Sequence, residues 1–240
     1  MSVFKAKPRL GIAAATVLGF AAAQAADISG AGATFPYPIY SKWADAYKQQ
    51  TGIGLNYQSI GSGGGIKQIK AKTVTFGASD MPLEEKDLQE AGLVQFPMII
   101  GGVVPVVNVK GVQGGQIVLD GPTVAQIYMG EITKWNDPRI KKLNPTVPLP
   151  ETAIAPIYRS DGSGTNFLFT TYLSNSLPKF KDTIGASTSV QWPVGIGAKG
   201  NVDLAGLANG HVPNVEFEPR LARLPVHDGY CSGECFAVVG

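Results

Sequence analysis

Apolar side chains over most of the chain recur with two spacings, one typical of helices and the other of strands. Between residues 38 and 50, Tyr40, Trp43 and Tyr47 fall at positions i, i+3 and i+7, which predicts a helix with these rings on one face. Short apolar runs bounded by glycine or polar residues predict strands between such helices. The predicted strands are 55–59, 75–78, 96–107 and 154–158, and the predicted helices are 38–50, 82–91, 123–129 and 137–143, with two more directly after the glycine-rich segments 61–65 and 161–165.

Strands that alternate with helices in this way predict an α/β fold with a mostly parallel sheet. The segment 96–107, interrupted by Gly101 and Gly102, is apolar enough to be a buried strand. After residue 201 the pattern ends: no Lys occurs from Val202 onward, and the apolar spacing there predicts neither a helix nor a strand. Both histidines and both cysteines lie in this last stretch, at His211, His227, Cys231 and Cys235.

The N-terminus has the pattern of a secretory signal peptide. Three basic residues precede an apolar run over 10–22, which leads to the small-x-small sequence Ala23-Gln24-Ala25. This run is shorter than the ~20 residues that a membrane-spanning helix needs. We therefore predict that residues 1–25 are a signal peptide and that the mature chain begins near Ala26. Because no Cys stands at the cleavage site, we expect no lipid anchor. An exported protein without an anchor is retained only where there is an outer membrane, so we expect a location in the periplasm.

Composition narrows the classes of function. A hydrophobic content of 44% supports a packed core, and the net charge of +2 lacks the strong basic excess of a nucleic-acid-binding protein. Because the net charge is this small, we expect no nucleic-acid partner. The 30 glycines and 17 prolines predict many tight turns and loops that approach a ligand with their backbone.

Three glycine-rich loops share one design, in which a predicted strand ends, Gly stands beside Ser or Thr, and a helix begins. They are 30–35, 61–65 and 161–165. At a helix start the free backbone N–H groups and the helix dipole favour an anion, and a hydroxyl adds a further donor. One such loop is usually an ordinary turn. Three of them at strand-to-helix junctions predict an anion site, since open α/β sheets bind ligands at their strand ends.

Arg159 stands directly before the third loop. Its guanidinium is planar, always charged and suited to tetrahedral oxyanions. Asp161 is placed to pair with Arg159 and hold its orientation. The alternative is an ordinary surface ion pair between the same two residues.

Asp80 indicates which anion fits. A carboxylate repels a bound anion unless that anion carries a proton to donate. Phosphate keeps a proton near neutral pH and sulfate does not, so Asp80 favours phosphate over sulfate. The alternative is that Asp80 caps the helix predicted at 82–91, and the two roles are compatible.

Catalytic and metal-binding motifs match poorly. The glycines of 195–200 fit a dinucleotide spacing, but no helical pattern follows them. Neither Ser62 nor Ser163 stands in a Gly-x-Ser-x-Gly elbow, and no His precedes His211, so the commonest general base is missing. We therefore expect no enzyme activity, no cofactor and no metal site.

Cys231 and Cys235 leave two alternatives open. With His227 they have a spacing that could touch a metal, but three ligands in an unpatterned stretch are a weak signal. In an exported protein a local disulfide or two free thiols is the better prediction.

Several short motifs extend the picture beyond single loops. They are Gly30-Ala-Gly-Ala-Thr-Phe-Pro36, Trp43-Ala-Asp45, Gly61-Ser-Gly-Gly-Gly65, Phe76-Gly-Ala-Ser-Asp80, Gly101-Gly-Val-Val104, Val118-Leu-Asp-Gly121, Ile132-Thr-Lys-Trp135, Arg159-Ser-Asp-Gly-Ser-Gly-Thr165 and Gly197-Ala-Lys-Gly-Asn201. With these motifs, residues 28–201 resemble the periplasmic phosphate-binding proteins of phosphate ABC transporters. The resemblance implies a two-lobed, hinged periplasmic binding protein of type II that closes on dehydrated phosphate. It also implies delivery to a membrane permease with a cytoplasmic ATPase, and a monomeric chain without a cofactor.

The resemblance also implies the ligand residues and the layout of the domains. By motif, phosphate ligands fall on Thr34, Phe35, Ser62, Asp80, Arg159, Ser163, Gly164 and Thr165, with Asp161 holding the arginine. Residues 26–100 correspond to the first part of lobe one and 101–201 to part of lobe two. Residues 202–240 show no likeness to the family, so we expect the C-terminal part of its fold to be missing. Two rival hypotheses are a secreted phosphate-ester hydrolase using Ser62 or Ser163, and a non-functional truncated remnant that is poorly stable and binds phosphate weakly or not at all.

Overall fold

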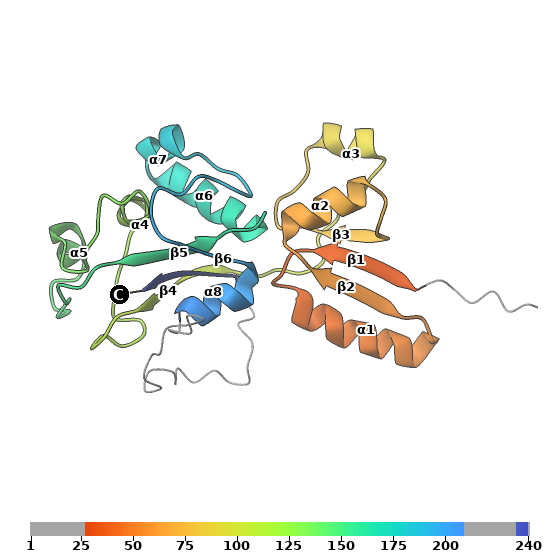
Figure 1. Ribbon diagram of the computed structural model, residues 1–240, viewed down its shortest axis with the longest axis horizontal. Helices are drawn as coiled ribbons and strands as arrows, with labels where there is room; N and C mark the ends of the chain where they lie inside the picture. The colour runs from red at the N-terminus through yellow and green to blue at the C-terminus, as the bar shows by residue number, and fades with distance from the viewer. Residues whose placement is uncertain (1–26, 209–233, 240) are drawn as a thin grey trace, which may run out of the picture.

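The computed structural model describes residues 27–208 and 234–239, which form two lobes (Figure 1). Lobe one contains β1 (Ile28–Gly32), α1 (Tyr37–Thr51), β2 (Leu55–Ser59), α2 (Ser62–Lys70), β3 (Phe76–Ala78) and α3 (Glu85–Ala91). Lobe two contains β4 (Val103–Asn108), α4 (Gly121–Tyr128), α5 (Pro138–Leu143), β5 (Ala155–Arg159), α6 (Gly164–Ser176), α7 (Pro178–Thr183), β6 (Ile196–Ala198), α8 (Gly200–Ala208) and β7 (Glu234–Val239). The predicted signal peptide, the two histidines and Cys231 lie outside the described residues.

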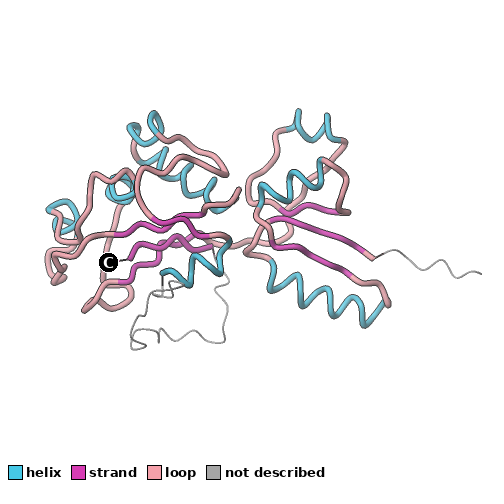
Figure 2. The backbone as a smooth tube through the Cα atoms, in the orientation of Figure 1, coloured by secondary structure: helices cyan, strands magenta, loops and turns pink. Residues whose placement is uncertain are grey.

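Lobe one is a three-stranded parallel sheet in the order β2-β1-β3. Figure 2 shows α1 on one face of this sheet and α2 on the other. Tyr40, Tyr57 and Phe76 pack together, with Tyr40 edge-on to Tyr57 at 4.9 Å and Tyr57 stacked on Phe76 at 5.8 Å between ring centroids. Gly30 of β1 is required here, because a β-carbon on it would lie 2.1 Å from the ring of Phe76. The aromatic group therefore anchors β1, whose end begins the first glycine-rich loop.

The aromatic face predicted for α1 is only partly buried. Tyr40 is 9% exposed, whereas Trp43 and Tyr47 are 44% and 39% exposed. The helix itself is confirmed, and Gly52 ends it in a left-handed conformation at φ 75°. Trp43 and Tyr47 line a surface hollow with Ile28 and Leu55. Periodicity thus identified the helix, but one turn of its apolar face lies on the surface of the described protein.

Lobe two is a four-stranded mixed sheet in the order β4-β7-β5-β6. Helices α4, α6 and α7 cover one face and α8 lies on the other (Figure 1). Trp135, Tyr128, Phe180 and Leu173 are fully buried and form the centre of its core. Tyr128 also donates a hydrogen bond of 3.0 Å to the carbonyl of Ile157 in β5. This packing makes β5, which carries Arg159, a rigid element.

Two elements, α8 for most of its length and all of β7, lie beyond residue 201, where the sequence pattern predicts none. Helix α8 buries Leu204 and Ala208 against Ile157 and Ala198. Strand β7 lies between β4 and β5, parallel to the first and antiparallel to the second. Helix α8 is built from small and apolar residues on most sides, so it has almost no helical periodicity to read. Its place is decided by contact with the sheet.

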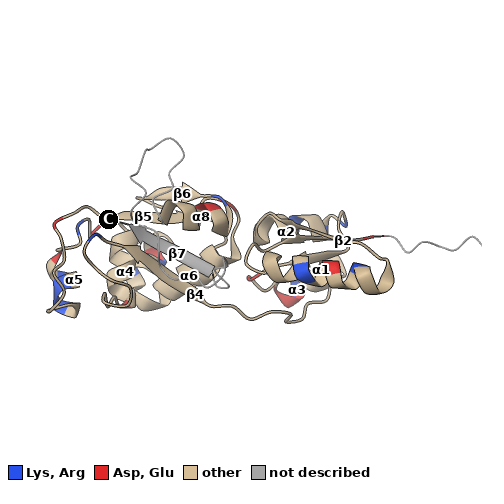
Figure 3. Ribbon diagram, turned by 90° about the horizontal axis from the view of Figure 1, so that it is seen from below, with Lys and Arg blue, Asp and Glu red and all other residues tan. Residues whose placement is uncertain are grey.

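The prediction of one buried strand over 96–107 is wrong in its first half. Only Val103–Asn108 forms β4, and Phe96 and Ile100 are 70% and 96% exposed. The segment before β4 connects the two lobes (Figure 3) and pairs with no strand of the described protein. An apolar segment becomes a strand only where a neighbour satisfies its backbone.

Charged residues are spread over several elements of both lobes (Figure 3). Within the described ranges, no helix has both the length and the hydrophobicity needed to cross a bilayer. The same part of the chain holds no cluster of three or more His, Cys, Asp or Glu side chains arranged for a metal ion.

Candidate anion-binding site

The three glycine-rich loops meet where the two lobes touch. The backbone N–H of Gly63 donates to the carbonyl of Gly162 at 2.8 Å, joining the second loop to the third. Arg159 Nη1 lies 3.4 Å from Thr34 Oγ1, joining the third loop to the first. A β-carbon on Gly164 would lie 2.5 Å from both Asp80 and Ser62. All the residues predicted as ligands by motif therefore belong to loops that converge on one place, although they lie up to 131 positions apart in the sequence.

The first loop is held by hydrogen bonds from within lobe one. Ala33 donates its N–H to the carbonyl of Ala78 at 2.9 Å, and its own carbonyl accepts from the buried hydroxyl of Tyr57 at 2.7 Å. Burial raises the pKa of Tyr57, so its hydroxyl stays protonated and donates. Thr34 and Phe35 follow directly and lead into α1. The backbone of this loop is thus positioned before any ligand contact.

Ser62 and Asp80 form a reciprocal pair in lobe one. The Ser62 hydroxyl, which is fully buried, donates to Asp80 Oδ2 at 3.2 Å and accepts from the Asp80 N–H at 3.2 Å. The alternative that Asp80 caps the following helix is wrong, because α3 begins at Glu85 with Glu84 at its N-cap. Burial and then the charge of Asp80 raise the pKa of nearby Tyr40. Asp80 is therefore an acceptor at the lobe interface.

Arg159 and Asp161 form a buried ion pair with two hydrogen bonds. Arg159 Nε donates to Asp161 Oδ1 at 2.6 Å and Nη2 donates to Oδ2 at 2.5 Å, and the two side chains are 1% and 13% exposed. The alternative of an ordinary surface pair is wrong. Burial by itself would raise the pKa of Asp161, but the hydrogen bonds and charge of Arg159, with the N–H of Gly200, lower it below its ordinary value. Arg159 is therefore held as a cation in a fixed orientation.

The third loop opens helix α6. Ser163 caps this helix, since its Oγ accepts from the Asn166 N–H at 3.2 Å, and its own N–H donates to the Thr188 carbonyl at 2.9 Å. Gly164 and Thr165 occupy the first two positions of the 13-residue helix, where backbone N–H groups have no acceptor within the helix. Both are buried, as is Ser163. The helix start thus offers N–H donors and the positive end of its dipole to the lobe interface.

The charges at the interface fit a hydrogen-bonding site better than a strongly cationic one. Arg159 is matched by Asp161, and Asp80 adds a further carboxylate from lobe one. An anion at this place would meet N–H and hydroxyl donors together with the Asp80 carboxylate. Such a set of groups suits a tetrahedral oxyanion that carries a proton.

Sequence reasoning assigned no role to the residues that hold the fork from the other side. Asn201 Oδ1 accepts from Arg159 Nη1 at 2.7 Å, and the Gly200 N–H donates to Asp161 Oδ1 at 3.2 Å. Both belong to the motif Gly197-Ala-Lys-Gly-Asn201, which is the signal that the sequence offers for them. The contact itself joins residues 42 positions apart and has no local pattern.

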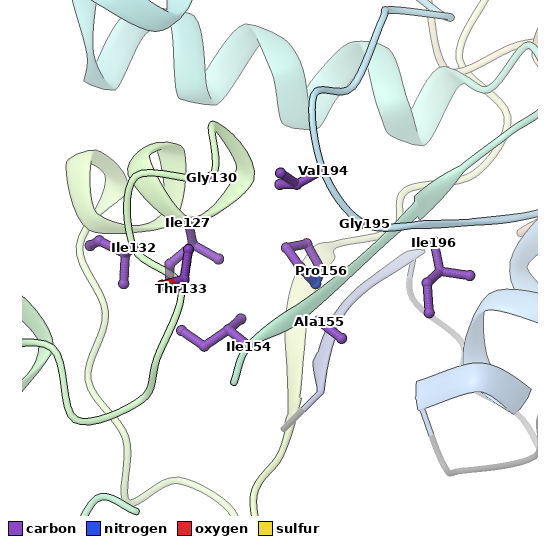
Figure 4. A pocket seen from close by; sticks show the side chains of 10 residues that line it. All are labelled: Ile127, Gly130, Ile132, Thr133, Ile154, Ala155, Pro156, Val194, Gly195 and Ile196. Atoms are coloured by element: carbon purple, nitrogen blue, oxygen red, sulfur yellow. The ribbon is translucent and has the colours of Figure 1, made fainter. Parts of the chain in front are cut away.

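A separate apolar hollow of about 290 Å³ lies in lobe two (Figure 4). Ile127, Ile132, Ile154, Pro156 and Val194 line it with their neighbours. Its lining includes none of the predicted ligand residues and no charged side chain. Apart from the Thr133 hydroxyl, the side chains that line it offer no hydrogen-bond donor to an anion.

Comparison with known proteins places the chain in a family. A family model described as a PBP superfamily domain matches residues 20–217. The chain belongs to the PBP superfamily. The phosphate-binding proteins PstS of Haemophilus influenzae and Pasteurella multocida are each 56% identical to it, over 183 and 182 residues. These matches cover 76% of this chain but 55% and 53% of the relatives, so the chain spans about half the length of the curated relatives it matches.

Solved structures of other proteins show a similar fold. A putative phosphate ABC transporter substrate-binding protein with bound phosphate from Clostridium perfringens aligns with a TM-score of 0.56 at 18% identity, covering 89% of this chain and 70% of that one. An ABC-type phosphate transport receptor from Vibrio cholerae aligns with a TM-score of 0.51 at 19% identity, covering 88% and 70%. The predicted two-lobed α/β architecture is thereby confirmed.

Asp161→Asn is expected to reduce stability at pH 7, and this loss is expected to become smaller as the pH falls below about 4. Because its folded-state pKa lies below the ordinary value of about 3.8, ionised Asp161 contributes stability above about pH 4 that is lost as pH falls through the folded pKa. The expected loss at pH 7 is about 1–3 kcal/mol, the cost of a buried charge left unpaired. Urea unfolding at pH 7, 5 and 3 measures it, with exposed Asp87→Asn as the matched control. The same loss at pH 3 as at pH 7 would contradict the ionic role of Asp161.

Proposed function

We propose that this chain is the exported substrate-binding subunit of a phosphate ABC importer and binds inorganic phosphate where its lobes meet. The observation that carries the proposal is the convergence of three donor loops, Arg159 and Asp80 on one buried place between the lobes. The 56% identity to the phosphate-binding proteins PstS of Haemophilus influenzae and Pasteurella multocida supports it. The chain acts in the periplasm as a monomer without catalysis, and delivers phosphate to permease subunits that are driven by a cytoplasmic ATPase.

Each predicted ligand has a chemical role in this proposal. Arg159, the N–H groups of Phe35, Gly164 and Thr165, and the hydroxyls of Thr34, Ser163 and Thr165 donate to phosphate oxygens. The Ser62 hydroxyl, which donates to Asp80 in this structure, turns its one hydrogen to the anion when phosphate binds. Asp80 accepts the proton that phosphate retains. Asp161 stays paired with Arg159 and makes no contact with the anion.

Asp80 makes the proposal testable by anion choice. The unmutated chain is expected to bind phosphate at least tenfold more tightly than sulfate at pH 7, because only phosphate can donate to Asp80. Asp80→Asn is expected to weaken phosphate binding and shrink this preference, since an amide can also donate. Calorimetric titration with both anions measures the ratio, and exposed Asp87→Asn serves as the charge-matched control in the same lobe. Equal affinity of the unmutated chain for the two anions would refute the role of Asp80.

The two rival hypotheses make different predictions for the same purified chain. The hydrolase hypothesis requires turnover of p-nitrophenyl phosphate, and no histidine lies within the described residues to act as its base. The remnant hypothesis requires that added phosphate leaves thermal unfolding unchanged. Under our proposal the unfolding midpoint rises with phosphate concentration and no p-nitrophenol is released.

A further inference from the structure

The guanidinium of Arg159 can be accounted for donor by donor. Arginine carries about five N–H donors in a planar fork. Three of the Arg159 donors have acceptors within lobe two: Nε and one Nη2 hydrogen on Asp161, and one Nη1 hydrogen on Asn201. On the edge of the guanidinium away from Asp161, the second Nη1 hydrogen is donated across the lobe interface to Thr34 Oγ1 and one Nη2 hydrogen is left. Thr34 of lobe one lies 3.4 Å from Nη1, so this edge faces the lobe interface.

Asn201 is held in place by the helix that carries it. It is the second residue of α8, and Leu204 and Ala208 follow it at i+3 and i+7, which places the three on one side of the helix. Leu204 is fully buried and Ala208 is 3% exposed, both packed on Ile157 of β5. The Gly200 N–H on Asp161 fixes the start of the same helix. The side of α8 that packs on the sheet therefore carries Asn201 to Arg159.

We propose that Asn201 is a positioning residue that sets which Arg159 hydrogens remain for the anion. Asp161 fixes one edge of the guanidinium, and Asn201 takes an Nη1 hydrogen, so the fork cannot tilt away from lobe one. Without Asn201 one hydrogen of the buried Nη1 group has no acceptor, which is costly, and the guanidinium rotates toward a different acceptor. This inference rests on the proposed phosphate function, since it says how Arg159 meets phosphate.

The choice of an amide over a carboxylate follows from charge. Arg159 and Asp161 cancel, and Asp80 already leaves one negative charge beside the anion. A carboxylate at position 201 would accept the same hydrogen bond but add a second negative charge. The remaining charged residues close to this position in sequence, Lys199 and Asp203, are exposed and screened by solvent. An amide oxygen is thus the acceptor that orients Arg159 with the least repulsion of phosphate.

Three variants test the proposal: Asn201→Ala, Asn201→Asp and the control Asp203→Asn, an exposed residue in the first turn of the same helix. Phosphate affinity is measured by calorimetry from pH 6 to pH 8, and folding by thermal unfolding. Asn201→Ala is expected to lose about tenfold in affinity at every pH, the usual effect of one hydrogen bond to a charged group. Asn201→Asp keeps the acceptor, so its loss is small at pH 6 and grows toward pH 8 as phosphate gains its second charge. Asp203→Asn is expected to match the unmutated chain within about twofold.

The outcomes separate this inference from the proposed function. If the unmutated chain binds no phosphate, the proposed function fails and the inference fails with it. If the unmutated chain binds phosphate and both Asn201 variants match Asp203→Asn, the positioning role is overturned while the function stands. If Asn201→Ala and Asn201→Asp lose affinity equally with parallel pH profiles, Asn201 only stabilises α8, which also overturns the proposal.

Discussion

Replacing Arg159 with alanine is expected to weaken phosphate binding by at least a hundredfold. Arg159 is 3% exposed and lies at the lobe interface, where a hydrogen bond from a charged donor is worth about 1.5–3 kcal/mol. Two of its donors face that interface, and their loss together exceeds the ~2.7 kcal/mol that corresponds to a hundredfold. The substitution also leaves the Asp161 carboxylate, 13% exposed, without its cation.

Two further variants separate the geometry of Arg159 from charge alone. Lys67→Ala removes an exposed cation from α2 and is expected to leave phosphate affinity unchanged within about twofold, because solvent screens that charge. Arg159→Lys keeps the charge but loses the planar fork, so one Asp161 oxygen loses its partner and affinity falls to an intermediate value. Calorimetry with circular dichroism on all three variants checks binding and folding. Equal losses for Arg159→Ala and Lys67→Ala would show that Arg159 does not contact the anion.

Gly164→Ala is expected to reduce phosphate affinity by roughly tenfold to a hundredfold by holding the lobes apart. A β-carbon at Gly164 would lie 2.5 Å from Asp80 Cβ, Asp80 Oδ2 and Ser62 Oγ, all of which belong to lobe one. Asp80 Cβ is attached directly to the backbone, so the clash is relieved only if one lobe moves. Within lobe two alanine is tolerated at the first position of α6, because alanine favours helix. A separation that removes one or two charge-assisted hydrogen bonds accounts for the expected loss.

Two quantities are measured for Gly164→Ala: its affinity for phosphate and its radius of gyration. Small-angle scattering with saturating phosphate is expected to give a larger radius of gyration for the variant than for the unmutated chain. Gly102→Ala is the matched control, because a β-carbon there meets nothing within 4 Å. Thermal unfolding of Gly164→Ala without phosphate is expected to match that control. Unchanged phosphate affinity in Gly164→Ala would mean that the lobes do not close on the ligand at this residue.

Local pattern was sufficient for most elements that precede residue 176. The predicted strand 55–59 coincides with β2, and the predicted helix 38–50 lies within α1, which spans Tyr37–Thr51. Helix α3 starts at Glu85, three residues later than predicted, because the backbone of Leu83 is hydrogen-bonded to the Gln95 side chain and Glu84 is extended at the N-cap. The loops at 30–35, 61–65 and 161–165 were recognised because glycine and hydroxyl residues at a strand-to-helix junction are a local signal.

Pairing between distant segments was decided by the tertiary structure. The exposed segment before β4 has the composition of a buried strand, yet in the described protein it joins the lobes without a paired neighbour. Helix α8 has little periodicity, yet it packs on β5 and carries Asn201 to Arg159. Composition cannot indicate which backbone or side chain lies opposite, since that depends on contacts between residues far apart in the sequence.

The candidate site shows the same division. The sequence by itself determined the prediction of an anion site, because Gly beside Ser or Thr recurs at three strand-to-helix junctions with Arg159 at one of them, and because Asp80 favours an anion that carries a proton. Only the tertiary structure decided that Asp80 pairs with Ser62 and not with the helix after it, and that the Arg159 fork is buried and held on two sides. Residue types report which hydrogen bonds a side chain can make. Thr34 lies 125 positions from Arg159, and Arg159 lies 42 positions from Asn201. These contacts form only when the two lobes and helix α8 have packed together.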